Sequence, residues 1–223
     1  TPLDELGQRF RNAHLVACST EGEIEGAQVF EDAIVATSIC FQHTQVQVAQ
    51  VRIIPGRSNH EAGVQLAELM ARPMLAHLFV ISSAVDCELG ELTRCLTRTL
   101  PRHVALTGGV ASAVCVHGRP LGNALVAVGF YGYRLRVGYG ALEGEDSLRS
   151  EGLHGPGSHS PALAIVTSTA GGQAPTERAK EEARSVRALL GPTVALTGFC
   201  AQANVSPFLT SPRQTTVTTL REE

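Results

Sequence analysis

A thiol, two hydroxyls, a glycine and two carboxylates follow one another between Cys18 and Glu23. The apolar residues 15–17 before them predict a buried strand, so the polar cluster would leave a sheet at a strand's carboxyl end, where open α/β sheets place ligands. There Gly22 would let the backbone approach a ligand closely, and Glu21 and Glu23 could hold an amine or a cation. The alternative is a polar turn that leaves both glutamates in solvent.

A second polar cluster, Thr107-Gly108-Gly109, follows another apolar run. If both runs are strands of one sheet, the two loops emerge at the same edge. Their hydroxyls and glycine amides could then face a carboxylate or phosphate while Glu23 faces an amine, so an amino-acid-like zwitterion would satisfy both ends. Glu23 could alternatively cap a helix or pair with an arginine. The predicted ligand-binding residues are Cys18, Ser19, Thr20, Gly22, Glu23, Thr107, Gly108 and Gly109.

Two other kinds of chemistry remain open at this stage. Cys18 could be a nucleophile, which requires a base within reach and a lowered thiol pKa, but none of the 8 histidines stands in a signature arrangement with it. Any one of these histidines could be the axial ligand of a haem, since a single imidazole suffices. Neither a Gly-x-Gly-x-x-Gly nor a Walker pattern is complete, and no Cys-x-x-Cys pair predicts structural zinc.

The elements that position these residues form an internal repeat. Val-Ala-Leu-Thr-Gly occurs at Val104 and at Val194, and Val16 begins a looser copy. Each copy follows a predicted helix and precedes another apolar run, which predicts three units of helix, strand, polar loop and strand. The fold class is therefore α/β (α+β), with mixed, mainly antiparallel sheets flanked by helices in two similar halves.

Apolar spacing and capping residues predict the individual elements. Ala33 to Phe41 is expected to be a largely buried strand, in a hairpin with residues 46–53. A second hairpin is expected from Ala124 to Tyr139. A further strand is predicted over 77–83, and helices are predicted near 2–13, 59–69, 87–100 and 176–190.

Composition excludes some classes of function. The net charge of −3 gives no support for nucleic-acid binding, and no apolar run is long enough to cross a membrane. Six cysteines without a signal peptide favour a cytoplasmic protein with reduced thiols. Glycines and prolines between Gly144 and Pro161 predict a linker. The expected division is residues 1–143, a linker over 144–161, and residues 162–223.

The stretch Val16 to Ile24 resembles the Cys-Ser-Thr-x-Gly-Glu-Ile signature of FIST domains, sensory domains named for F-box and intracellular signal transduction. Leu106 to Ala111 is similar to the Gly-Gly-x-Ala element of their amino-terminal module, and Leu163 to Leu220 looks like a shortened carboxy-terminal module. The resemblance implies a small-ligand sensor, with amino acids or related metabolites as ligands, that signals through a partner protein.

The alternatives that remain open are a haem-binding nitric-oxide or gas sensor, a cysteine-dependent hydrolase or transferase, and a protein-interaction module with a degenerate pocket.

Overall fold

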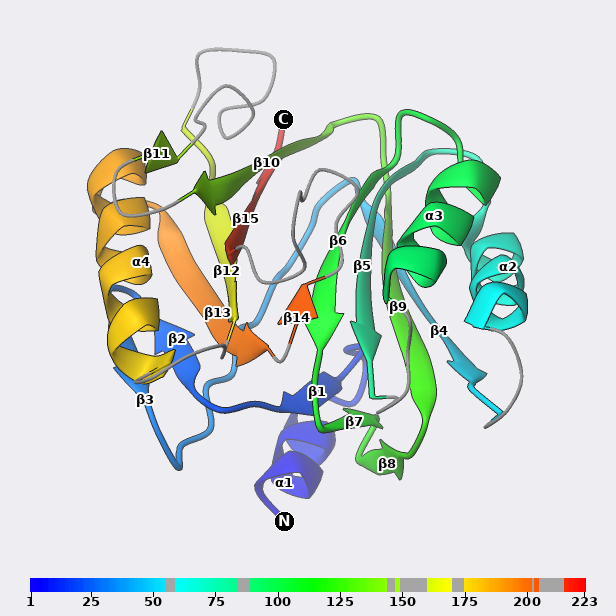
Figure 1. Ribbon diagram of the computed structural model, residues 1–223, viewed down its shortest axis with the longest axis horizontal. Helices are drawn as coiled ribbons and strands as arrows, with labels where there is room; N and C mark the ends of the chain where they lie inside the picture. Colours follow the sequence, from blue (N-terminus) through cyan, green and yellow to red (C-terminus); the bar gives the residue numbers. More distant parts are fainter. Residues whose placement is uncertain are drawn as a thin grey trace.

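The computed structural model describes residues 1–54, 59–83, 89–143, 147–148, 160–169, 175–201, 203–204 and 215–223. Two sheets pack face to face, and helices cover both outer faces (Figure 1). The layers run from helix α4 through a seven-stranded sheet and a five-stranded sheet to helices α2 and α3. The predicted mixed α/β fold in two similar halves is confirmed.

The five-stranded sheet carries two helices on its outer face. Only β5 and β6 run parallel, and the other neighbours are antiparallel. Leu78, Val80 and Leu106 alternate onto the face that packs against Leu66 of α2 and Leu92 of α3. The elements are, in sheet order, β14 (Ala203–Asn204), β6 (Ala105–Val110), β5 (Leu75–Ser82), β9 (Ala124–Tyr131) and β4 (Gln45–Arg52), with α2 (Asn59–Met70) and α3 (Leu89–Thr99).

The seven-stranded sheet repeats this arrangement around α4. Its parallel pair is β12 and β13, and α4 buries Ala179, Ala183 and Val186 against Val166 and Ile24 of the sheet. The elements are, in sheet order, β11 (Ser147–Leu148), β10 (Leu135–Glu143), β15 (Thr215–Glu222), β12 (Leu163–Thr169), β13 (Ala195–Ala201), β2 (Glu23–Glu25) and β3 (Gln28–Phe30), with α4 (Pro175–Leu190).

The internal repeat is twofold, not threefold. Units β5-α3-β6 and β12-α4-β13 are equivalent, and Gly108 and Gly198 occupy the same place in them. A Cβ on either glycine would lie 1.8 or 1.9 Å from the carbonyl oxygen of Val80 or Val166 in the neighbouring strand. The close approach of the parallel strands therefore explains the shared Thr-Gly letters.

The predicted third copy at Val16 is wrong. Its strand β1 (Val16–Ser19) belongs to a separate three-stranded sheet, antiparallel to β7 (Ala113–Val116), which also pairs with β8 (Arg119–Leu121). The preceding helix α1 (Pro2–Arg9) has the predicted Thr1 cap but buries none of its residues. Three of its four residues are partly buried and Ser19 is exposed, which is not the burial of a strand inside either large sheet.

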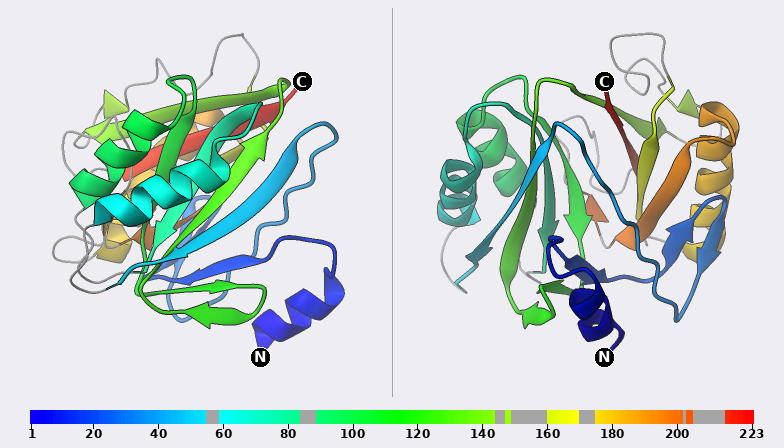
Figure 2. Two further views of the ribbon diagram at one scale, coloured as in Figure 1. Left: turned by 90° about the vertical axis from the view of Figure 1, so that its right-hand side faces the viewer. Right: turned by 180° about the vertical axis from the view of Figure 1, so that it is seen from behind.

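The prediction of a buried strand from Ala33 to Phe41 is also wrong. These residues form no strand and are mostly exposed, and they run as one extended stretch from β3 to β4 (Figure 2). We call residues 33–41 the crossing segment, because they connect an edge strand of one large sheet to an edge strand of the other. Apolar composition alone predicted a buried strand, but no sheet edge pairs with this segment.

Both predicted hairpins are wrong for a related reason. Strand β4 pairs with β9 and not with residues 33–41, and β10 pairs with β15 and β11, so β9 and β10 belong to different sheets. The predicted linker over 144–161 lies mostly outside the described residues, which include only 147–148 and 160–161 of it. The division of the chain stays a prediction; the seven-stranded sheet takes strands from both sides of that boundary.

The inner faces of the two large sheets meet in an aromatic and aliphatic layer. Phe130, Leu135, Leu163 and Leu220 form its buried centre. Nearer the carboxyl ends of β5 and β13, the rings of Phe79 and Phe199 make an edge-to-face contact, with their centroids 6.4 Å apart. The polar residues of the candidate site lie in this inter-sheet layer.

Candidate functional site

The predicted Cys18–Glu23 cluster connects the two sides of the molecule. Strand β1 ends at Ser19 and strand β2 begins at Glu23, so these residues lead from the three-stranded sheet to the seven-stranded sheet (Figure 1). On the first side, Cys18 packs against a cluster that includes Phe79 and Ile81 of the five-stranded sheet. The short stretch therefore lies beside both large sheets.

Glu23 lies on the inner face of the seven-stranded sheet. It is the direct antiparallel partner of Phe199, and directly opposed residues place their side chains on the same face. Since the Phe199 ring contacts Phe79 across the inter-sheet layer, the Glu23 carboxylate enters that layer as well. The Ile24 side chain lies on the opposite face of the seven-stranded sheet, where it packs against α4.

The two oxygens of the Glu23 carboxylate have different surroundings. The Thr20 hydroxyl donates a hydrogen bond of 2.8 Å to Oε1. The other oxygen, Oε2, is buried and has no hydrogen-bond partner among the described residues. A buried polar atom without a partner costs about 1–3 kcal/mol, and more when it carries charge. This oxygen is therefore an unused acceptor in the inter-sheet layer.

The neighbouring thiols are held in their neutral form. Burial, with a smaller contribution from the Glu23 charge, raises the pKa of Cys18 to about 12. On the opposite face of the sheet, burial and the charges of nearby glutamates raise the pKa of Cys200 to about 12. A thiol with such a pKa is protonated at neutral pH, whereas a nucleophilic cysteine needs a lowered pKa.

A row of hydroxyls continues from Glu23 across the seven-stranded sheet. Phe199 opposes Thr167, and Thr167 opposes Thr216, so all three side chains share the inner face with Glu23. The Thr216 hydroxyl oxygen is also buried without a hydrogen-bond partner in the described part of the chain. Three strand spacings separate it from Glu23, roughly 14 Å, so one small ligand cannot reach both atoms.

The second predicted cluster lies inside a strand rather than in a loop. Thr107, Gly108 and Gly109 all belong to β6, so the loop prediction is wrong. The Thr107 hydroxyl is hydrogen-bonded at 2.8 Å to Nε2 of His77. Gly108 packs against the backbone of β5, and Gly109 pairs with β14. These contacts leave no loop of free amides that could hold a phosphate or carboxylate.

His77 is the buried polar residue that sequence reasoning missed. Its ring stacks on Phe130, with centroids 5.3 Å apart and planes 12° apart, and its Nδ1 has no partner among the described residues. Complete burial lowers the pKa of His77 to about 3, so the ring is neutral. The sequence did carry a signal for this position. Side chains alternate along a strand, so His77 lies on the face opposite to Leu78 and Val80, which is the inner face.

The remaining two predicted residues face away from Glu23. Ser19 is exposed and pairs with Ala113 in the three-stranded sheet. Gly22 is buried on the α4 side, where an added Cβ would lie 3.3 Å from the Cys200 sulfur. Of the eight predicted ligand-binding residues, the structure therefore brings Cys18, Thr20 and Glu23 together beside the unused oxygen. Thr107 also faces the inter-sheet layer, from the opposite sheet, because it is the direct partner of Phe79.

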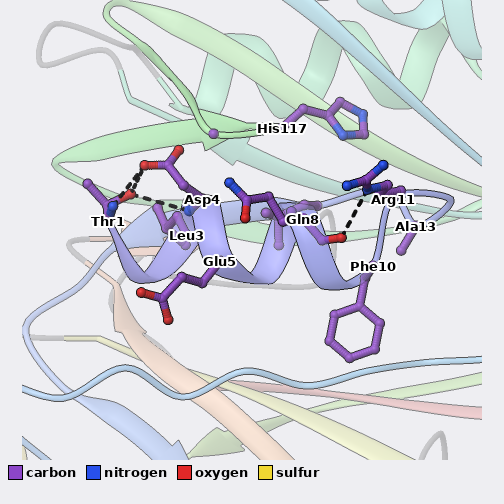
Figure 3. Close-up of a pocket in the computed structure, with 12 residues that line it drawn as sticks. Thr1, Leu3, Asp4, Glu5, Gln8, Phe10, Arg11, Ala13 and His117 are labelled. Atoms are coloured by element: carbon purple, nitrogen blue, oxygen red, sulfur yellow. Dashed lines mark hydrogen bonds and ion pairs between the residues drawn. The ribbon is translucent and has the colours of Figure 1, made fainter.

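A surface hollow lies elsewhere, beside α1 (Figure 3). It has a volume of about 620 Å³, is open to solvent, and is lined by α1 residues, among them Asp4 and Gln8, and by His117. None of the eight predicted residues lines it. The His117 ring lies 5.8 Å from that of His14, centroid to centroid, but the described residues contain no group of three metal-ligating side chains.

The family model of the FIST N domain matches residues 2–151, which is more than half of the chain. The chain belongs to the FIST family. The Cys18–Glu23 cluster lies within the matched part of this FIST protein, as do strands β1 to β10 and helices α1 to α3. No curated protein gives a significant match to the chain. FIST domains are sensory domains, so a sensory role follows from membership of the family.

Proposed function

We propose that this FIST protein binds a small ligand with a protonated amine, an amino acid or a related metabolite, at Glu23 between the two large sheets. The observation that carries the proposal is the Oε2 atom of Glu23, buried and without a hydrogen-bond partner among the described residues. An ammonium group would donate a charge-assisted hydrogen bond to this oxygen, which is one of the stronger interactions available to a carboxylate.

The surroundings of Glu23 favour an amine over a metal ion. Thr20 already donates to the first carboxylate oxygen, and the Phe79 and Phe199 rings supply an aromatic wall on the same face of the layer. A hard cation such as Ca²⁺ or Mg²⁺ would need several oxygen ligands, which this layer does not supply around Glu23. A single ammonium needs fewer partners and tolerates an aromatic wall.

The support is stronger for the amine end of the ligand than for its carboxylate end. In the sequence-based scheme, Ser19, Thr20, Thr107 and the glycine amides hold the anionic group. Thr20 instead donates to Glu23, Thr107 is bonded to His77, and Ser19 is exposed. The proposed ligands are therefore small molecules with a protonated amine, whether or not they also carry a carboxylate.

The alternatives find less support at this site. The Cys18 thiol is neutral, which disfavours a cysteine-dependent hydrolase or transferase. Of the histidines that the structure describes, only His77 is buried, and it is engaged with Thr107 and Phe130. No observation favours haem. A protein-interaction module with a degenerate pocket predicts instead that no small amine binds.

Signalling through a partner protein in the cytoplasm belongs to the same proposal. Sensory domains act by passing ligand binding on to another protein or domain, and this requires a difference between the bound and free states. None of the helices that the structure describes is long and apolar enough to cross a membrane.

The proposal is tested by a thermal-shift screen of free amino acids and small amines against the same compounds acetylated on nitrogen. Binding to the folded state raises the melting temperature, and acetylation removes the charge that Glu23 would recognise. We expect some free amines to raise it and their acetylated forms to have no effect. Equal effects of both forms, or none from either, would contradict the proposal, and a Soret band in the purified protein would favour haem.

A further inference from the structure

The inter-sheet layer contains a second buried polar atom without a partner. His77 is completely buried on the inner face of β5, and its Nδ1 has no hydrogen-bond partner among the described residues. The Phe79 ring connects this position to Glu23, because it contacts the rings of both His77 and Phe199, with centroids 6.4 Å apart in each pair. Phe199 is the direct strand partner of Glu23. Each of the two large sheets therefore contributes one unused polar atom to the layer.

The hydrogen bonds of His77 identify which ring nitrogen carries the proton. A neutral imidazole has one N–H donor and one acceptor nitrogen. The Thr107 hydroxyl is bonded to Nε2 at 2.8 Å, its one hydrogen bond within the described part of the chain. If Nε2 carried the proton, the hydroxyl hydrogen of Thr107 would lie buried without an acceptor. Thr107 therefore donates to Nε2, and Nδ1 of His77 is an N–H donor that has no acceptor.

The strand geometry sets the length of a ligand that could join the two unused atoms. Glu23 lies one strand away from Phe199, and His77 lies two residues away from Phe79. With strands about 4.8 Å apart and about 3.3 Å of rise per residue, the two atoms are roughly 10–14 Å apart. A hydrogen bond of about 2.9 Å at each end leaves roughly 4–8 Å between the two polar atoms of the ligand.

The charges of the layer favour an uncharged ligand group at the His77 end. The amine of the ligand would neutralise Glu23. None of the arginine and lysine side chains that the structure describes is buried, so a carboxylate on the ligand would have no counter-ion in the layer. Burying an unpaired charge costs far more than burying a hydrogen-bonded neutral group. A carbonyl or hydroxyl oxygen therefore matches the His77 donor better than a carboxylate does.

We propose that Nδ1 of His77 donates a hydrogen bond to an uncharged oxygen of the same ligand whose amine binds Glu23. The inference rests on the proposed function and narrows its ligands to small amines with a carbonyl or hydroxyl oxygen roughly three to six bonds from the nitrogen. Amides of amino acids and amino alcohols have this chemistry. A free amino acid with its carboxylate is a weaker ligand of the same site.

Three matched series of compounds test the inference by calorimetric titration. The first contains glycinamide, 3-aminopropanamide, 4-aminobutanamide and 5-aminopentanamide. The second contains the amino carboxylates of the same chain lengths, and the third contains the plain alkylamines. We expect the best amide to bind roughly threefold to tenfold more tightly than its alkylamine, the value of one hydrogen bond, and at least about tenfold more tightly than its carboxylate.

The possible failures separate this inference from the proposed function. If the amides bind no better than the alkylamines, or the carboxylates bind as tightly as the amides, the role of His77 is wrong while an amine site at Glu23 stands. If amines from the thermal-shift screen bind and none of the three series does, the narrowed ligand class is wrong. If no amine binds at all, the proposed function and this inference fail together.

His77→Phe assigns the effect to the imidazole. The variant keeps an aromatic ring beside Phe130 and removes Nδ1, so the amides should bind no better than the alkylamines, whose affinity should not change. His103→Phe, at an exposed position, is the matched control and should bind like the wild type. Retention of the amide preference in His77→Phe would overturn the proposal.

Nitrogen-15 NMR of the wild-type protein tests the donor without a variant or a ligand. The chemical shifts of the two ring nitrogens of His77 differ according to which one carries the proton. We expect the proton on Nδ1, with Nε2 as the acceptor of the Thr107 hydroxyl. A proton on Nε2 would make Nδ1 an acceptor and would overturn the proposal, even if His77→Phe did not fold.

Discussion

The replacement Gly108→Ala tests the place where, among the glycines that the structure describes, an added Cβ would come closest to neighbouring backbone. The added Cβ would lie 1.8 Å from the Val80 carbonyl oxygen and 2.7 and 2.8 Å from its carbonyl carbon and amide nitrogen. All three atoms are backbone, so no side chain can rotate out of the way. Gly108 also has φ of +146°, a conformation that alanine rarely adopts.

The cost of Gly108→Ala follows from how far the strands must separate. Ordinary contacts begin at 3.4 Å, so β5 and β6 must part by more than about 1 Å near this position. Losing about two inter-strand hydrogen bonds costs about 0.5–1.5 kcal/mol each, and the overpacking adds about 1–3 kcal/mol. The expected loss is therefore roughly 2–6 kcal/mol, a large part of the 5–15 kcal/mol typical of a folded domain.

Urea unfolding of Gly108→Ala measures this loss as a lower midpoint at unchanged slope. Gly122→Ala is the matched control, because an added Cβ there meets no atom within 4 Å, and its effect should stay within about 0.5 kcal/mol. Gly198→Ala, with a Cβ 1.9 Å from the Val166 oxygen, should behave like Gly108→Ala. If Gly108→Ala and Gly122→Ala were equally stable, the close strand approach and the structural explanation of the repeat would be refuted.

Three further predictions concern the buried polar groups. With a pKa of about 12, Cys18 should react with iodoacetamide far more slowly than the exposed Cys40 at neutral pH; equal rates would contradict its burial beside Glu23. Because burial lowers the pKa of His77 to about 3, the unfolded chain binds a proton between about pH 6.5 and 3 that the folded chain does not, so stability should fall as the pH falls through this range by about 1.4 kcal/mol per unit. His77→Gln should remove that part of the slope in unfolding curves between pH 6.5 and 5, and an unchanged slope would exclude His77 as its source. Thr20→Val should cost about 1–3 kcal/mol in urea unfolding, because it leaves Oε1 of Glu23 without its donor, and a neutral effect would mean that water replaces the hydroxyl.

Local signals predicted the helices and the strand pair at the centre of each half. Thr1 does cap α1, and the apolar spacing of α2, α3 and α4 matches the faces that they bury. The Val-Ala-Leu-Thr-Gly repeat marks equivalent strands because both halves need a glycine at the same close contact. Helix caps and helix faces depend on residues near one another in the chain. The repeated letters depend on the close strand contact that both halves share.

Strand pairing could not be predicted in the same way. An apolar stretch such as residues 33–41 reads as a buried strand whether or not a sheet edge is available to it. Strands β9 and β10 adjoin in sequence, yet each finds its partners in a different sheet. The pattern of one strand does not specify its neighbour, and here the neighbours come from distant parts of the chain.

The arrangement around Glu23 could be predicted only in part, because it combines local sequence with long-range strand pairing. The Cys18–Glu23 cluster is local, so its residue types suggested a polar site and included Thr20, which does hold Glu23. The pairing of Glu23 with Phe199, which directs the carboxylate into the inter-sheet layer, is a long-range contact without a local signal. The prediction that Thr107 lies in a loop beside Cys18 was wrong because it assumed that β1 and β6 share one sheet; Thr107 lies inside β6. Its part in ligand binding stays a prediction.

The most direct test of the proposed function is calorimetric titration of Glu23→Gln with an amine selected by the thermal-shift screen. The substitution keeps the shape of the side chain and removes its charge. We predict a loss of about 1.5–3 kcal/mol in binding free energy, roughly tenfold to a hundredfold in Kd, with little change in stability. Glu25→Gln, on the same strand and exposed, should bind like the wild type. Unchanged affinity of Glu23→Gln, or a large loss of stability in its place, would assign Glu23 to the scaffold and contradict the proposed site.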